Sequence, residues 1–77
     1  MKEYRMKIAV VIERDEQGYY AFAPDLPGCH SQGKSFEAVE INIKEAIDLY
    51  LETLNEEELS ELTRSTIYTT AYEFNYA

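Results

Sequence analysis

The stretch between residues 19 and 35 constrains the fold more than any other part of this sequence, and it reads YYAFAPDLPGCHSQGKS. Pro24 and Pro27 each fix their own φ angle, lack a backbone donor and favour an extended conformation in the preceding residue. Gly28 can adopt the positive φ angle that a type II turn requires after Pro27. Residues 24–28 therefore predict a rigid turn, which connects strands to a helix.

Segments of alternating polarity predict three strands in the first half of the chain. Residues 4–13 alternate between an apolar and a mixed face, which predicts a half-buried strand; its apolar face holds Tyr4, Met6, Ile8, Val10 and Ile12. Residues 19–23 predict the return strand, with Tyr20 and Phe22 on one face. The small alanines on its other face let another element pack closely. Residues 29–32 predict a short third strand.

A helix is predicted from Ser35, a candidate N-cap, to about Asn55. Its apolar residues recur at helical spacing and form one stripe, which consists of Phe36, Val39, Ile43, Ala46, Ile47, Tyr50 and Leu54. Ile41 and Leu49 lie off this stripe, so we expect them to be exposed, and Ile41 could also contact a partner. Residues 56–63 continue with helical character.

The final segment, residues 66–76, is rich in Thr, Tyr and Phe and predicts a last strand. Its tyrosines could simply pack within the sheet. Alternatively, the far end of the segment reaches beyond the domain and contacts another chain through Tyr72, Phe74 and Tyr76. A 77-residue core is small, and small domains often gain stability by association. We therefore expect a homo-oligomer, in the simplest case a dimer.

The predicted element order is β-β-β-α-β. Three antiparallel strands, one helix on a face of the sheet and a last strand define a two-layer α+β domain. The length of the chain corresponds to one domain, residues 1–77. No apolar run approaches the ~18 residues of a membrane span. The single cysteine excludes an internal disulfide, and the chain fits a reducing cytoplasm.

The net charge of −8 is concentrated in one region. Residues 1–34 are neutral. Residues 35–62 hold Lys44 as their one base and nine acids: Glu37, Glu40, Glu45, Asp48, Glu52, Glu56, Glu57, Glu58 and Glu61. Direct nucleic-acid binding requires the opposite sign of charge. Two interpretations remain, a solvated helix face that keeps the protein soluble and an electrostatic match to a basic protein partner.

The sequence offers no evident catalytic or cofactor site. His30 and Cys29 are neighbours in a predicted strand, so their side chains point to opposite faces and form no dyad within one chain. A zinc site needs more Cys and His ligands than this chain contains. We interpret Cys29 as a small buried apolar residue and His30 as a surface residue. We expect no enzymatic activity, no cofactor and no bound metal.

Two of the motifs described above also carry a family resemblance. Residues 20–29, YAFAPDLPGC, and residues 33–38, GKSFEA, resemble the signature of HicB-type antitoxins. In that family a strand ends in a PDLPG-like turn, and a short strand and a helix start follow. The resemblance implies a partial RNase H-like fold and the antitoxin role of a type II toxin–antitoxin pair. Operator binding belongs to an additional C-terminal domain of longer members and is not carried over.

The resemblance also implies a partner, a HicA-like toxin that is small, basic and cleaves mRNA. For contact with it we select the turn and the acidic helix, namely Asp25, Leu26, Pro27, Gly28, Glu37, Glu40, Glu45, Asp48 and Glu52. Two other functions stay open. One is an orphan HicB-like binding or oligomerisation module with a different partner. The other is a weak metal-dependent nuclease that retains RNase H-like ancestry. Such an enzyme needs carboxylates that converge on the metal ions, and the carboxylates of this chain are scattered.

Overall fold

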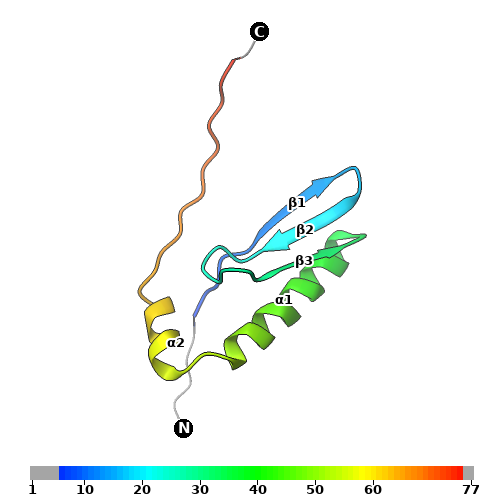
Figure 1. Ribbon diagram of the computed structural model, residues 1–77. Coiled ribbons are helices and arrows are strands. Elements are labelled where there is room, and N and C mark those ends of the chain that lie inside the picture. The colour runs from blue at the N-terminus through cyan, green and yellow to red at the C-terminus, as the bar shows by residue number, and fades with distance from the viewer. Residues whose placement is uncertain (1–5, 76–77) are drawn as a thin grey trace.

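Three strands and two helices make up the regular structure of the described part of the chain. The structure is a computed structural model that describes residues 6–75. The elements in chain order are β1 (Val11–Asp15), β2 (Gly18–Phe22), β3 (His30–Gly33), α1 (Phe36–Glu52) and α2 (Glu56–Leu62). Helix α1 runs beneath the sheet, and α2 lies beyond its C-terminal end (Figure 1). The predicted α+β class and the order β-β-β-α are confirmed.

The sheet is antiparallel with the strand order β1-β2-β3, so β1 and β3 are its edges. β1 and β2 form a tight hairpin in which Val11 lies opposite Phe22 and Asp15 lies opposite Gly18. β3 returns beside β2 with His30 opposite Phe22. It begins one residue later than predicted and ends at Gly33.

The core lies between β2, the turn after it and one face of α1. Its buried residues are Ala21, Ala23, Leu26, Cys29, Val39, Ile43 and Ile47. The small alanines of β2 let the helix approach the sheet, as predicted from their alternation. Ile41 and Leu49 are 57% and 65% exposed, which confirms that they lie off the buried stripe.

Side-chain caps fix the starts of both helices. The Ser35 Oγ accepts a hydrogen bond from the Ala38 N–H at 3.1 Å, which confirms Ser35 as the N-cap of α1. Asn55 caps α2 through a capping box, in which Asn55 Oδ1 accepts from the Glu58 N–H and Glu58 Oε1 accepts from the Asn55 N–H. Asn55 thus precedes a second helix and does not end the first. As an N-cap residue it has an extended backbone conformation, which interrupts the helical path between α1 and α2.

Two predicted strands differ from the structure by more than one residue. β1 begins at Val11 and not at residue 4, because β2 ends at Phe22 and offers residues 6–10 no pairing partner. Tyr4 lies outside the described residues. The last strand predicted at 66–76 is wrong as far as it is described, since residues 66–75 form neither helix nor strand. Isolated strands are not stable without backbone partners. Tyr76 lies outside the described residues.

Candidate protein-binding surface

The turn predicted around Gly28 is a closed loop, residues 23–29, with three backbone hydrogen bonds. The Leu26 N–H donates to the Ala23 carbonyl oxygen at 3.0 Å, and the Cys29 N–H donates to the Leu26 carbonyl oxygen at 2.9 Å. The Ala23 N–H donates to the Cys29 carbonyl oxygen at 3.0 Å and closes the loop. Gly28 has a φ of 82°, as a type II turn after proline requires. The 23–29 loop therefore has a fixed shape.

Leu26 anchors the 23–29 loop in the core. Its side chain is 1% exposed, although it lies in the middle of a turn. Pro24, Pro27 and Gly28 are exposed around it. A partner thus meets a preformed apolar surface, and little conformational entropy is lost when such a surface docks.

The acidic helices, α1 and α2, carry the entire net charge of the protein. Five acidic side chains and one lysine lie on α1 and four acidic side chains lie on α2, which together give the −8 of the whole chain. The one ion pair among residues 6–75 joins Lys44 Nζ and Glu40 Oε1 at 4.0 Å on the helix surface. Such an exposed pair contributes little stability. The acidic helices therefore present a net negative field to solvent.

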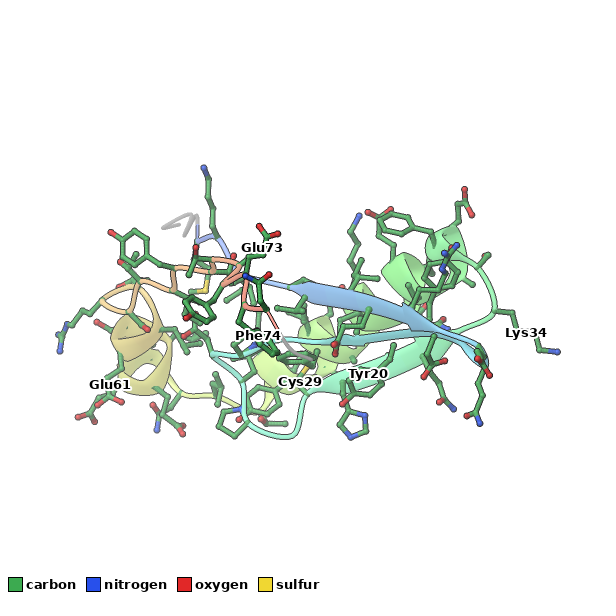
Figure 2. The ribbon with its side chains drawn as sticks, turned by 90° about the horizontal axis from the view of Figure 1, so that it is seen from above. Tyr20, Cys29, Lys34, Glu61, Glu73 and Phe74 are labelled. Atoms are coloured by element: carbon green, nitrogen blue, oxygen red, sulfur yellow. The ribbon has the colours of Figure 1, made fainter. Side chains whose placement is uncertain are left out.

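The structure places the 23–29 loop beside the C-terminal part of α1 and beside α2. A surface hollow of about 290 Å³ joins these elements and is lined by Asp25, Leu26, Tyr50, Leu54, Glu58, Glu61, Leu62 and Ser65. The Ser65 Oγ donates to Asp25 Oδ1 at 3.0 Å. Glu61 lies on the outer side of α2, and Lys34 lies at the far end of the molecule (Figure 2).

The predicted contact residues do not all lie together: some lie near the 23–29 loop and others at the opposite end of α1. Asp25 lines the same hollow as Glu58 and Glu61 of α2, two carboxylates that were not among the predicted contact residues. Glu37 lies in the first turn of α1, about 22 Å along the helix from Glu52 at the rise of an α-helix. Glu37 and Glu40 therefore extend the acidic field away from the loop. Sequence spacing alone does not place residues 25 and 61 at one hollow, because this placement depends on tertiary packing.

A second patch that sequence reasoning missed lies on the open face of the sheet. The ring of Tyr20 stacks on His30 with 5.8 Å between centroids and lies 6.0 Å from the ring of Phe22. Tyr20 is 40% exposed, because α1 covers only the opposite face of β2. Together with the 23–29 loop these rings line a hollow of about 310 Å³. The alternation in residues 19–23 could have indicated this patch, because the strand face opposite the alanines carries aromatic side chains.

Cys29 is a buried apolar residue of the core, as predicted. Its side chain is 5% exposed, and burial raises the pKa of the thiol above its ordinary value because the thiolate loses solvation. The thiol is therefore protonated at neutral pH, and the nucleophilic form is rare. His30, by contrast, is exposed on the open sheet face.

Alkylation of Cys29 by iodoacetamide at neutral pH is expected to be slow in the folded protein. We expect at least about a tenfold lower rate than in the urea-unfolded chain, because only the accessible thiolate reacts. The rates are measured by intact-mass spectrometry over time, with a short cysteine peptide in the same buffer as the reference. Equal rates in the folded and unfolded chain would contradict the burial of this thiol.

Within residues 6–75 there is no group of three or more His, Cys, Asp or Glu side chains placed to hold a metal ion. In the same part of the chain, no helix has the length and apolar character needed to cross a membrane.

Comparison with known proteins identifies relatives over most of the chain. A UPF0150 protein of Helicobacter pylori is 50% identical over 72 residues, which cover 94% of this chain and 100% of the relative. A UPF0150 protein of Archaeoglobus fulgidus is 58% identical over 48 residues, 61% of this chain and 70% of the relative. An uncharacterised 14.9 kDa protein of Haemophilus phage HP1 is 37% identical over 78% of this chain, which matches only 44% of the phage protein. No solved structure matches significantly.

A family model described as "HicB_like antitoxin of bacterial toxin-antitoxin system" matches residues 8–77. This match covers the hairpin, the 23–29 loop and both acidic helices, which are the elements that build the surface described above. The chain therefore belongs to the family of HicB-like antitoxins of bacterial toxin–antitoxin systems.

Proposed function

We propose that this protein is the antitoxin of a type II pair and neutralises a HicA-like toxin, a small basic protein that cleaves mRNA. The observation that carries the proposal is the rigid 23–29 loop beside two helices that hold all eight excess negative charges. A basic RNA-binding surface is complementary to such a field. The protein acts by covering that surface, so it requires no catalytic chemistry of its own. It acts in the cytoplasm, where mRNA is translated.

The contact surface that we propose combines a shape element and a charge element. The residues Asp25, Leu26, Pro27 and Gly28 provide the preformed shape, of which Leu26 is the buried anchor and Pro27 the exposed tip. Carboxylates on the acidic helices provide the field, which accelerates encounter with a basic partner. Exposed Ile41 and Leu49 lie among these carboxylates and offer apolar contacts within an acidic rim. The toxin thus meets the loop and the outer side of the helices.

Titration of this protein into an RNA-cleavage assay of a HicA-like toxin tests the proposal. We expect cleavage to fall in proportion to added protein and to cease at a fixed stoichiometric ratio, because a bound antitoxin excludes RNA from the toxin. The assay is read from the length of the RNA on a denaturing gel. Undiminished cleavage at molar excess would contradict the proposed function.

Two controls make this assay specific. An unrelated basic ribonuclease should retain its activity, since general polyanion inhibition would act on both enzymes. The protein alone, with Mg²⁺ or Mn²⁺, should leave RNA and RNA–DNA hybrids intact. Cleavage by the repurified protein alone would instead support the metal-dependent nuclease. Inhibition of both ribonucleases to the same extent would show that charge without shape accounts for the effect.

We also propose that the protein forms a homo-oligomer in solution. Its buried core comprises seven residues, and the aromatic C-terminal segment with Tyr72, Phe74 and Tyr76 provides the contact. The first two of these side chains are 85% and 65% exposed in the single chain. Exposed aromatic side chains on an extended segment favour association with another surface.

A further inference from the structure

The C-terminal segment, residues 66–75, extends away from the body of the protein in a strand-like pattern (Figure 1). Tyr68 is 89% exposed and Tyr72 is 85% exposed. The rings of Tyr72 and Phe74 stack with an interplanar angle of 13°, as expected for residues i and i+2 on one side of an extended chain. The radius of gyration is 15.0 Å, against about 11 Å for a compact chain of this length. The segment is thus extended like a strand, although it forms no strand among the described residues.

The two edges of the sheet differ in accessibility. The edge at β3 lies against α1, since Asn42 Nδ2 donates to the Gln32 carbonyl oxygen at 2.9 Å. A Cβ atom built on Gly33 would lie 2.7 Å from the Val39 nitrogen, which shows how closely the helix approaches this strand. Within residues 6–75, β1 pairs with β2 alone, so the outer side of β1 is open. An added strand therefore fits beside β1.

Residues 6–10 extend this open edge. They continue the alternation of β1, yet β2 does not reach them. Ile8 packs against the core, and Val10 is 38% exposed. Residues 6–9 also line an open hollow of about 470 Å³, together with Asp25 and residues of the stretch 62–67. The edge available to an added strand therefore runs from residue 6 to residue 15. It has the same length as the C-terminal segment, residues 66–75.

The charges of the two segments do not oppose this contact. Residues 66–75 carry one charge, Glu73, and the edge from residue 6 to residue 15 is neutral, since Lys7 and Arg14 balance Glu13 and Asp15. The eight excess negative charges lie on the acidic helices and not on either of these segments. Two copies can therefore join at this edge without bringing their like-charged acidic helices into the contact.

We propose that residues 66–75 of one copy pair as an added β-strand with residues 6–15 of a second copy. The exchange is reciprocal and closes a two-fold symmetric dimer. Each copy contributes three exposed aromatic side chains, Tyr68, Tyr72 and Phe74. The six side chains of a dimer could bury about 1,000 Å² in total, which is near the lower limit for a specific protein interface. The inference specifies the contact of the homo-oligomer proposed above and does not involve the 23–29 loop.

The direct test is an isotope-filtered NOE experiment on an equal mixture of ¹³C-labelled and unlabelled full-length protein. This experiment records only contacts between different copies. We expect intermolecular NOEs between the rings of Tyr68 or Tyr72 and the methyl groups of Ile8 or Val10. Contacts between these residues that occur only within one copy would overturn the proposal, because the segment would then fold back on its own β1.

A matched pair of variants tests the backbone pairing. Ala71→Pro removes a backbone N–H from the segment, whereas Ala71→Ser keeps it. In sedimentation equilibrium at micromolar concentration, the serine variant should remain a dimer and the proline variant should shift at least about tenfold in dissociation constant. Deletion of the residues after Ser65 should give the monomer, with the fold checked by far-UV circular dichroism.

Each outcome has a defined meaning. A monomeric full-length protein, or a dimer that both the proline variant and the truncated chain retain, would overturn the proposal. The RNA-cleavage assay is independent of it, because toxin binding uses the loop and the acidic helices. A truncated monomer that still inhibits the toxin would therefore leave the antitoxin function intact while confirming the separate role of the C-terminal segment.

Discussion

Gly33→Ala is expected to destabilise the protein by about 3 kcal/mol, because the added methyl group has no space between β3 and α1. A Cβ atom at this position would lie 2.7 Å from the backbone nitrogen and 3.0 Å from the Cα of Val39. These are backbone atoms of the first turn of α1, so no side chain can rotate to relieve the contact. The helix would have to move away from the sheet. A loss of this size is a large part of the total stability of a domain with about 80 residues, on the order of 4–12 kcal/mol.

Gly28→Ala is the matched control. It adds the same methyl group, but the cause of the destabilisation differs. A Cβ atom at residue 28 would meet nothing within 4 Å, but its φ of +82° is unfavourable for alanine. The expected cost is about 1–2 kcal/mol, the conformational penalty alone. Urea unfolding followed by circular dichroism measures both variants. If Gly33→Ala is as stable as the unmodified protein, or Gly28→Ala is the less stable of the two, the close approach of α1 to β3 is incorrect.

The second large effect is expected for toxin binding after charge reversal on α1. The double variant Glu45→Lys, Asp48→Lys changes the net charge from −8 to −4, because each reversal adds two positive units. Both side chains are exposed, so stability should change little. The association rate with a HicA-like toxin at low salt should fall by about tenfold or more, since exposed charges act mainly through long-range steering. Stopped-flow fluorescence or biosensor kinetics give this rate.

A second double variant, Glu13→Lys, Glu16→Lys, provides the control of equal net charge. These exposed residues lie in and next to β1, at the hairpin and away from the acidic helices. If steering depends on where the charge lies, this variant should associate faster than the α1 variant. Equal slowing by the two variants would show that total charge alone controls the rate and that the acidic helices have no special position.

Local sequence signals predicted most of the fold. The alternation around Ala21 and Ala23 placed the packed face of β2, and the stripe with Val39, Ile43 and Ile47 placed the buried face of α1. These signals depend on the periods of strand and helix, which are properties of neighbouring residues. The turn around Gly28 was predictable for the same reason, because Pro27 and Gly28 restrict their own backbone angles.

The errors have two different causes. The start of α2 was available in the sequence, since Asn55 and Glu58 have the spacing of a capping box, but the acidic run was interpreted as a continuation of α1. The last strand was predicted from the composition of residues 66–76. Composition indicates that a segment can form a strand, but a strand also needs a neighbouring strand to pair with, and residues 66–75 form no strand in the part of the chain that the structure describes.

The candidate surface was predictable only in part. Its 23–29 loop follows from local residues, whereas the hollow that Asp25 shares with Glu58 and Glu61 depends on how α2 packs after the break at Asn55. The aromatic patch with Tyr20 and His30 depends on the register between β2 and β3, which places them diagonally on the same face. Contacts of this kind involve residues distant in sequence, and no single-sequence period encodes them.

The central claim is that a fixed loop and two acidic helices bind a basic toxin. The most direct measurement is the association rate of the unmodified protein with a HicA-like toxin, compared at about 20 mM and about 500 mM salt, where the screening length falls from roughly 20 Å to a few ångströms. We expect tight binding and a rate that falls at least about tenfold at the higher salt concentration. Absence of binding at either concentration, or a rate that does not change with salt, would contradict the central claim.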